Sequence, residues 1–271
     1  FARPGPMVRK FGPLYHQLVL LHLHQLQERV ETQGLEPFLA YLRRLSEKPK
    51  PARGDTAVVT HPEVVAAREV AEGVLAAGGA AVSHPKLDAL VEIVREEMER
   101  PRERPPRILV FAQYRDTIET IHAALEAQGW TVGRFVGQAS RGAHDRGMSQ
   151  GEQARVLQGF RQGAFAILAG SSVAEEGLDV PDVDLVVFFE SVASEIRAIQ
   201  RRGRTGRSSV GRVTILLTED TRDVGHQRAE ARREQSMRRI VRRLSRRPPT
   251  DEAGNGGPPK RRRAVGEAPS S

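Results

Sequence analysis

Two patterns of hydrophobic positions divide the chain. Between residues 14 and 100, apolar residues recur every three or four positions, as they do on the buried face of a helix. Pro62 opens a further helix that ends before Gly78, and residues 47–55 are expected to form a loop. This part therefore predicts a layer of helices, whose apolar stripes are Leu14, Leu18, Leu21 and Leu26; Leu35, Phe38, Leu39, Leu42 and Leu45; and Leu87, Leu90, Val91, Val94 and Met98.

After residue 107, short continuous apolar runs alternate with amphipathic helices. One of these helices opens at Ser149, which with Glu152 has the spacing of a capping box. Such alternation predicts an α/β fold in which helices cover both faces of a parallel sheet. The expected strands span residues 108–111, 131–136, 165–169, 185–189 and 212–217, with further helices near 117–128 and 194–202.

Composition shifts mark the expected boundaries. Residues 100–107 are dense in proline and charge, which predicts a linker that ends a helical part at residues 1–105. An α/β lobe follows at 106–221, then a basic helix at 222–247 and a disordered tail at 248–271. The arginine pairs of the basic helix suit either contact with nucleic acid or an ordinary solvated face.

Charge and composition narrow the classes of function. The 271 residues carry a net charge of +8 and include only five lysines, so arginine dominates a balance that suits a polyanionic partner. Cysteine is absent, which excludes disulfides, iron–sulfur clusters and cysteine zinc sites. The lack of cysteine also fits a reducing cytoplasm, where we expect the protein to be. No apolar run approaches the ~20 residues of a membrane span, so we expect it to be soluble. His16, His22 and His24 are expected to be packed or surface residues, and no metal site is predicted.

The richest motif is Gln200-Arg-Arg-Gly-Arg-Thr-Gly-Arg207. Glycine lets a backbone approach a ligand closely, and arginine presents a charged fork that matches phosphate oxygens. Two further polar segments, residues 111–117 and 171–181, each follow a predicted strand. Because the carboxyl ends of parallel strands meet at one edge of a sheet, the three segments predict a nucleotide-linked site there. The alternative for the arginine cluster alone is a solvated basic turn.

Together these segments resemble motifs IV, V and VI of superfamily 2 helicases. The strings Phe111-Ala-Gln-Tyr-Arg-Asp-Thr117, Phe135-Val-Gly-Gln-Ala-Ser140 and Glu175-Glu-Gly-Leu-Asp-Val-Pro181 look most like the archaeal Hef helicase-nucleases and the Fanconi anaemia M-type DNA translocases. The resemblance is strong over residues 108–223 and weaker over 34–98. It implies a second RecA-like lobe, preceded by part of a helical insert.

The resemblance also implies roles for individual residues. Arg204 and Arg207 would be arginine fingers on the γ-phosphate of ATP, with Gln200 beside the nucleotide. Gly177 and Asp179 would approach the ribose and couple it to DNA. Ser171 stands where relatives commonly have threonine, which keeps the hydroxyl. The expected contacts to the nucleic-acid backbone are Gln113, Tyr114, Arg115, Gln138, Ser140, Ser149 and Ser171.

The residues that bind ATP and Mg²⁺ in such motors are not found in this sequence. A P-loop needs a lysine between glycine and serine or threonine, and none of the five lysines has these neighbours. The only Asp-Glu-Ala string, 251–253, lies in the predicted tail. We therefore expect a fragment, since the chain begins at Phe1, that is inactive without a first lobe carrying the ATP and Mg²⁺ site. No downstream nuclease domain is recognisable.

The implied substrate is forked or branched DNA in repair and replication-fork processing. Two alternatives stay open. One is an RNA-directed relative, because Dicer and the innate RNA sensors share the helical insert and the Glu-Glu-Gly-Leu-Asp string. The other is a lobe without enzymatic activity that serves as a nucleic-acid-binding or scaffold module.

Overall fold

The computed structural model describes residues 6–78, 83–139, 146–171, 183–190, 210–225, 227–229 and 232. The described residues between 6 and 229 belong to one compact unit. The predicted helix near 194–202 and the predicted tail lie outside the described residues. Of the predicted basic helix, the structure describes residues 222–225, 227–229 and 232, all of them helical. The boundary near residue 105 stays a prediction.

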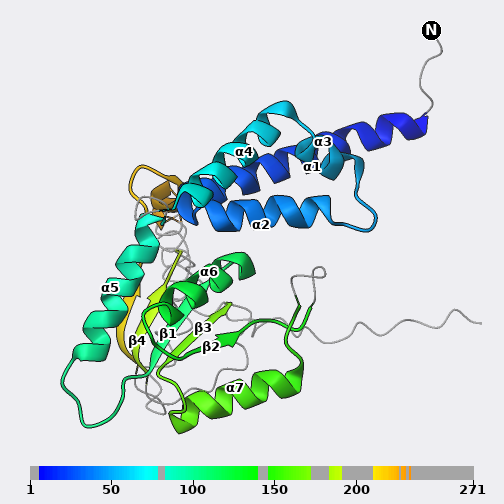
Figure 1. Cartoon of the computed structure of the whole chain (residues 1–271). Helices are drawn as coiled ribbons and strands as arrows, with labels where there is room; N and C mark the ends of the chain where they lie inside the picture. Colours follow the sequence, from blue (N-terminus) through cyan, green and yellow to red (C-terminus); the bar gives the residue numbers. More distant parts are fainter. Residues whose placement is uncertain are drawn as a thin grey trace, which may run out of the picture. The chain divides into compact units, whose positions relative to one another are not determined.

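Five parallel strands form one sheet, in the order β2-β3-β1-β4-β5 (Figure 1). The central strand β1 pairs with β3 on one side and with β4 on the other, and β2 and β5 are the edges. The parallel α/β sheet predicted from the alternating pattern is confirmed. Its strands are β1 (Ile108–Ala112), β2 (Val132–Phe135), β3 (Ile167–Ser171), β4 (Val183–Phe188) and β5 (Val210–Ile215).

Helices cover both faces of the sheet, as predicted (Figure 1). Helices α5 (Pro85–Glu99) and α6 (Arg115–Glu126) pack on one face, and α7 (Gln150–Gln162) packs on the other. Successive strand residues alternate between the two cores because side chains point to opposite faces of a strand. Thus Ile108 and Val110 join the first core, whereas Leu109 and Phe111 join the second.

The predicted strand at 165–169 begins two residues later in the structure. The ring of Phe165 packs against Phe160, the buried aromatic residue near the end of α7, with centroids 5.9 Å apart. Phe165 therefore belongs to the turn that closes the helix. The chain joins the sheet at Ile167, immediately after the Ala166 carbonyl accepts a hydrogen bond from the Ile108 amide.

The first four helices are α1 (Pro6–Thr32), α2 (Leu35–Ser46), α3 (Arg53–Val59) and α4 (Pro62–Ala77). Their apolar core contains Leu26, Phe38, Leu42, Val58 and Ala71. We call these four helices the helical part. None of the described helices of the chain is long and apolar enough to cross a membrane.

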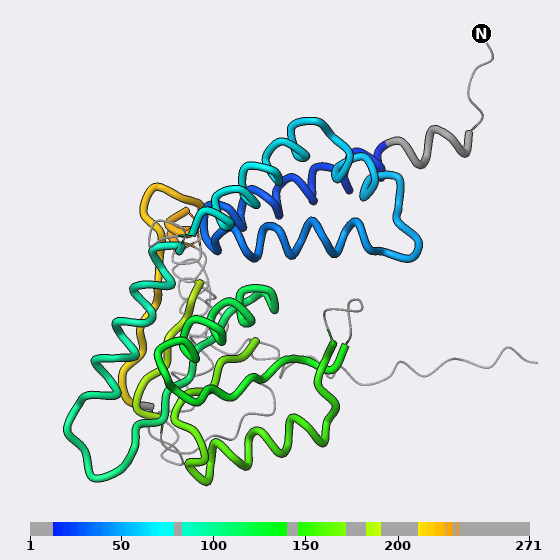
Figure 2. The backbone as a smooth tube through the Cα atoms, viewed as in Figure 1, coloured from blue at the N-terminus to red at the C-terminus, as the bar shows by residue number. Residues whose placement is uncertain are grey.

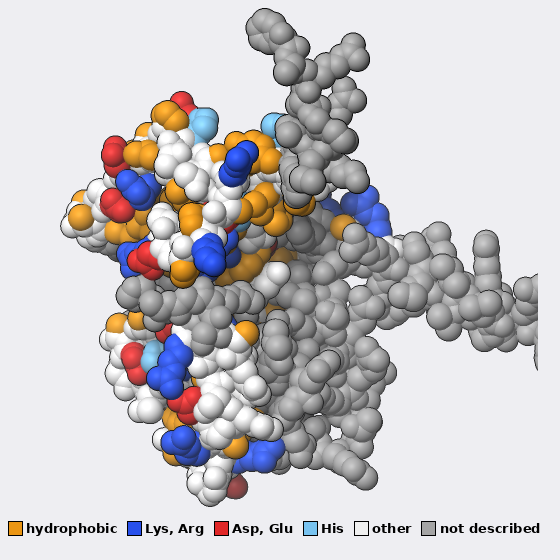
Figure 3. Space-filling view, turned by 90° about the vertical axis from the view of Figure 1, so that its right-hand side faces the viewer, with side chains coloured by type: hydrophobic (Ala, Val, Ile, Leu, Met, Phe, Trp, Pro, Cys, Tyr) orange, Lys and Arg blue, Asp and Glu red, His pale blue; other side chains and the backbone are white. Residues whose placement is uncertain are grey.

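The apolar stripe predicted for α1 is partly wrong. Leu14 is 60% exposed and Leu21 is 53% exposed, whereas the polar residues His22 and Arg29 are buried beside Leu26. The helix turns this face inward because both side chains find partners there: His22 binds Tyr41 and Asp55, and Arg29 Nη1 donates to Gln25. Large exposed hydrophobic residues in the described chain lie on α1 and α4, and hydrophobic side chains are visible over the upper part of Figure 3.

The loop predicted at residues 47–55 ends early, because α3 begins at Arg53. Asp55 explains this start. Its carboxylate accepts a hydrogen bond from the Ala52 amide at 2.8 Å, which satisfies one of the free donors at the beginning of the helix. The same carboxylate binds His22 at 2.7 Å and Lys48 at 2.9 Å, so a tertiary contact stabilises a helix that local pattern does not reveal.

The connection from α5 to β1, seen in Figure 2, is held by ion pairs. Arg102 and Arg104 both bind the carboxylate of Asp184, which also accepts a hydrogen bond from the Arg107 amide. Arg102 and Arg212 meet at the buried carboxylate of Glu97. These contacts fasten the proline-rich connection to the amino-terminal edge of the sheet.

Replacing either of two glycines by alanine should change the stability of the protein, in opposite directions. A Cβ at Gly211 would lie 2.2 Å from the Asp184 carbonyl oxygen, so we expect Gly211→Ala to lower the free energy of unfolding by about 2 kcal/mol. Gly73 lies in α4, where an added Cβ would have no atom within 4 Å, so Gly73→Ala should raise it by about 1 kcal/mol. Urea denaturation of both variants measures this difference. Equal stability of the two would contradict the described approach of β5 to β4.

Candidate functional site

The register of the strands brings three polar residues to the carboxyl-terminal edge of the sheet. Ser171 is the last residue of β3 and lies opposite Ala112, the last residue of β1. Gln113 follows directly, and Glu190 lies two residues beyond the end of β4. The Gln113 amide donates to Glu190 Oε2 at 3.1 Å, which ties the ends of β1 and β4 together.

A buried polar cluster surrounds Glu190. Lys86, at the beginning of α5, donates to the Phe189 carbonyl at 2.9 Å and forms an ion pair with Asp223. Asp223 also accepts a hydrogen bond from the Thr218 amide. The side chain of Gln33, just after α1, also interacts favourably with the charged form of Glu190. The cluster therefore joins helices and sheet at the edge where the strand-end motifs lie.

Burial raises the pKa of Glu190 to about 7, against an ordinary value of 4.5, while Lys86 and the Gln113 amide oppose the shift. Only 7% of the residue is exposed, and Oε1 has no hydrogen-bond partner in the described structure. Removing a carboxylate from water disfavours its charged form. Glu190 is thus poised to change its charge near neutral pH.

Ser171 is buried, with 4% exposure, and its hydroxyl has no hydrogen-bond partner among the described residues. Buried hydroxyls are rarely left unsatisfied, because the lost hydration is not repaid. Its position at the end of β3, beside the edge formed by Gln113, makes it a candidate for contact with a ligand. Ser171 begins the predicted motif V.

Arg115 is buried and directs its guanidinium to the loop after β2. Nη1 donates to the Ala139 carbonyl at 2.5 Å, and Nη2 donates to the Gly137 carbonyl at 2.7 Å. Gln138, between these two carbonyls, is exposed. Arg115 therefore holds the backbone on both sides of Gln138, and its charge lies within the protein.

Tyr114 lies against the helical part. The guanidinium carbon of Arg29 is 4.1 Å from the centre of its ring, and the Tyr114 hydroxyl interacts with Glu28 and Gln25. Burial raises the pKa of Tyr114, and the charge of Glu28 adds to this effect. The ring is thus used in packing against α1.

Ser149 caps α7 as predicted. Its hydroxyl accepts a hydrogen bond from the Glu152 amide at 3.3 Å, and the Ser149 amide donates to the Glu152 carboxylate at 2.7 Å. The exposed hydroxyl group therefore has a structural partner, and its role in nucleic-acid contact stays a prediction. The remaining predicted site residues lie outside the described residues: Ser140, Gly177, Asp179, Gln200, Arg204 and Arg207.

Sequence patterns missed three residues of this region. Glu190 directly follows the apolar run 185–189, so its place after a strand was a usable signal. Lys86 and Arg29 carried no such signal, because each lies in a helix among many charged neighbours. Only the packing of helices on the sheet shows that both are buried.

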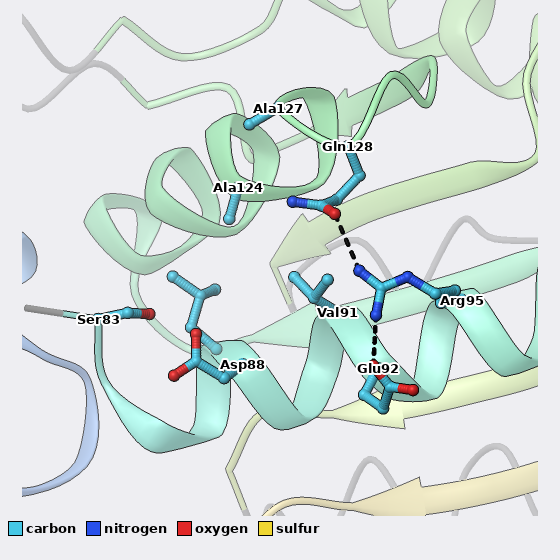
Figure 4. Close-up of a pocket in the computed structure, with 9 residues that line it drawn as sticks. Ser83, Asp88, Val91, Glu92, Arg95, Ala124, Ala127 and Gln128 are labelled. Atoms are coloured by element: carbon cyan, nitrogen blue, oxygen red, sulfur yellow. Dashed lines mark hydrogen bonds and ion pairs between the residues drawn. The ribbon is translucent and has the colours of Figure 1, made fainter. Parts of the chain in front are cut away.

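The groove in Figure 4 is a separate feature between α5 and α6, with a cavity volume of about 410 Å³. Arg95 reaches across it from α5 to Gln128 at 2.9 Å and also pairs with Glu92 (Figure 4). The α6 side of the groove comes from the last turn of that helix and the residues after it, away from the strand end that precedes the helix. Within the described ranges, no three potential metal ligands cluster in the structure.

Comparison with known proteins shows which proteins the chain is similar to. Residues 85–209 match the family described as helicase conserved C-terminal domain. The chain is 36% identical over 225 residues to a Methanocaldococcus jannaschii protein named as an ATP-dependent RNA helicase, covering 83% of this chain. It is 34% identical over 211 residues to the ATP-dependent DNA helicase mph1 of Neurospora crassa, covering 75% of this chain.

A solved structure agrees with these relatives. The crystal structure of the Pyrococcus furiosus Hef helicase domain shares 40% sequence identity with a TM-score of 0.61, over 80% of this chain and 43% of that one. The chain spans only 27% of the M. jannaschii relative and 17% of the N. crassa relative. The similarity thus concerns one part of longer proteins.

Glu190 predicts a pH dependence of stability. Its pKa is higher in the folded than in the unfolded protein, so the folded state retains a proton that the unfolded state releases. Stability from this group is therefore greatest below about pH 4.5, falls as the pH rises, and above about pH 7 has dropped by about 3 kcal/mol. Glu190→Gln should remove this dependence, because the amide does not titrate.

Urea denaturation of parent and Glu190→Gln at pH 5 and pH 8 measures the effect. The two proteins should have similar stability at pH 5, where the carboxyl group is protonated in the folded state, and the variant should be the more stable at pH 8. A difference in stability that is the same at both pH values would show that Glu190 does not titrate as described.

Proposed function

Because residues 85–209 belong to the helicase conserved C-terminal domain family, we propose that the chain is the second motor lobe, with helical insert, of an ATP-dependent DNA helicase or translocase. The proposal takes forked or branched DNA as the substrate, in repair and replication-fork processing. The similar proteins include the Hef helicase domain, a Fanconi anaemia group M protein homologue and the mph1 protein, which is named as an ATP-dependent DNA helicase.

The arrangement of the carboxyl-terminal edge carries this proposal. Gln113 and the unsatisfied hydroxyl of Ser171 lie on neighbouring strand ends of one parallel sheet. Ligands of open α/β sheets bind at this edge, outside the strand ends. The segment 200–207, with its arginines and glycines, follows the next strand of the same sheet in the sequence.

In this proposal, Arg204 and Arg207 act on the nucleotide as arginine fingers. Guanidinium groups offset the charge that develops on a transferring phosphoryl group, and they stay charged at working pH. Gln200 lies in the same segment, and Gly177 and Asp179 link the nucleotide to the nucleic acid. When bound, ATP with Mg²⁺ supplies the phosphoryl group and a metal that neutralises its oxygens.

The described residues do not form a cradle for that nucleotide. Lys86, the only lysine near the carboxyl-terminal edge among them, is buried and paired with Asp223. This supports the view that a first RecA-like lobe holds ATP and Mg²⁺ and that the second lobe supplies the arginines. The first lobe is then an obligatory partner for hydrolysis.

Contacts to the nucleic-acid backbone would come from donors that the structure leaves exposed or unsatisfied. Gln113 and Gln138 are exposed, and Ser171 has an unused hydroxyl. Ser140 and Ser149 complete the proposed set. Such contacts to phosphates fix the position of a strand without reading its sequence. Tyr114 and Arg115 would contribute by holding these loops.

An RNA-directed helicase is the second candidate, because the M. jannaschii relative is named as an RNA helicase. The third candidate is a module that binds nucleic acid without enzymatic activity. It would not need ATP, whereas the DNA helicase and the RNA helicase would. Separate experiments distinguish these alternatives.

The arginine fingers predict a selective loss of turnover. In the protein that includes a first lobe, Arg204→Ala or Arg207→Ala should lower kcat by ~10³-fold or more, while the Kd for DNA changes little. Arg68→Ala, at a partly exposed position of α4, is the matched control and should keep the parental kcat. The 271-residue chain alone should show no DNA-stimulated ATP hydrolysis. Normal turnover by the Arg204 and Arg207 variants would contradict the assignment.

If the substrate is forked DNA, forked DNA should compete for binding more strongly than double-stranded RNA. A labelled forked DNA bound to the chain should be displaced by unlabelled forked DNA at about tenfold lower concentration than by double-stranded RNA of equal length, measured at one fixed salt concentration. The fixed salt matters because phosphate contacts dominate affinity for both polymers. Preferential displacement by RNA would favour the RNA-directed candidate.

A further inference from the structure

The turn that follows β1 uses its side chains mainly for contacts with the helical part. Tyr114 stacks on Arg29 of α1. Both oxygens of Asp116 accept hydrogen bonds from Arg44 of α2 at 2.8 Å. The Thr117 hydroxyl donates to the Gln33 side chain at 2.8 Å. Three neighbouring residues of the predicted motif IV thus face the helices, and only Arg115 faces the loop 137–139.

Arg29 is almost fully buried, with 2% exposure. Its guanidinium carbon lies 4.2 Å from the ring centre of Tyr41 and 4.1 Å from that of Tyr114, so the cation is stacked between two tyrosines. Nη1 also donates to the carbonyl and side-chain oxygens of Gln25 at 3.0 and 2.7 Å. A buried cation is costly unless partners compensate it, and here the partners define one orientation.

The ring of Tyr41 is itself held in place. Its hydroxyl is 2.8 Å from His22 Nδ1, and His22 Nε2 is 2.7 Å from Asp55 Oδ1. Asp55 accepts further hydrogen bonds from Lys48 and from the Ala52 amide. Arg29 therefore rests on a fixed surface of the helical part, and it also contacts the ring of Tyr114.

Tyr114 lies in the sequence between Gln113, a proposed nucleic-acid contact, and Arg115, which holds the loop that carries Gln138, another proposed contact. Gln113 precedes it, and Arg115 follows it and binds the carbonyls on both sides of Gln138. A displacement of Tyr114 would thus move Gln113 directly and the loop 137–139 through Arg115. The stack on Arg29 is placed to prevent such a displacement.

We propose that Arg29 is a positioning residue for nucleic-acid binding: by stacking on Tyr114 it holds the turn 114–117, and through Arg115 the loop 137–139, in binding geometry. This inference rests on the proposed function. It makes the helical part a support for the strand-end contacts of the lobe. Arg29 itself touches no nucleic acid in this proposal.

The test compares two variants of α1 in the complete 271-residue chain. Arg29→Met keeps the length of the side chain but loses the charge and the planar fork. Leu26→Ala, one turn away, is the control, because it removes a buried side chain of the helical part without touching Tyr114. Urea denaturation first measures how much each variant loses in stability, and binding is then measured under conditions where both are folded.

Binding of a single-stranded oligonucleotide at fixed salt gives the main result. Arg29→Met should weaken Kd by about tenfold, the size expected for a desolvated cation–π pair. Leu26→Ala should change Kd less than about twofold, because its effect stays within the helical core. Arg29→Met added to Tyr114→Leu should cause no further loss, because the stack is already gone.

Unchanged binding by Arg29→Met, or equal weakening by Leu26→Ala, would overturn the proposal. Hydrogen exchange separates this failure from failure of the proposed function. The Gln113 amide bonds to Glu190 and the Ile118 amide bonds to the Tyr114 carbonyl, so both should exchange faster in Arg29→Met than in Leu26→Ala. If the parent binds no nucleic acid, the proposed function is wrong, whereas unchanged exchange in Arg29→Met rejects the coupling itself.

Discussion

The burial of the central strand β1 is the constraint on which the rest of the structure depends. All five of its residues are buried, and they alternate between the core under α5 and α6 and the core under α7. A slip of one residue would exchange the two faces, so hydrophobic packing holds the register firmly. Gln113 and Ser171 are therefore brought together by apolar residues that take no part in the site's chemistry.

A second, polar constraint joins the helical part to this sheet. Arg29 and Arg44 of the helical part, with Gln33 just after α1, meet the turn after β1. Apolar contacts tolerate small shifts, but buried polar groups must find particular partners at particular angles. The helical part is therefore oriented at the carboxyl-terminal edge by directional contacts, beside the residues that the proposed motor uses to hold its substrate.

Much of the fold was predictable, because its signals are local. Continuous apolar runs marked the strands, Pro62 and Pro85 marked helix starts, and Ser149 with Glu152 marked the start of α7. The predictions from sequence were wrong where a partner distant in the sequence determines whether a residue is buried or where a helix begins. The α1 face was assigned wrongly because His22 and Arg29 are buried by Asp55, Tyr41 and Tyr114, and α3 was missed because Asp55 gains its role from that same contact. An analysis of hydrophobic periodicity treats polar residues as exposed, because it contains no information about the tertiary partners that allow them to be buried.

For the site, the sequence by itself determined which segments follow strands, and hence that polar residues after β1 and β3 share one edge, since parallel strands leave no other arrangement. It also determined the type of domain, through the residues of three motifs. Tertiary structure alone decided what each side chain does there. It directs Arg115 to backbone carbonyls, Tyr114 to Arg29, and Glu190 into a cluster where burial raises its pKa. The reason is physical: a side chain's charge, partners and exposure depend on neighbours brought from other parts of the chain, and those neighbours exist only after folding.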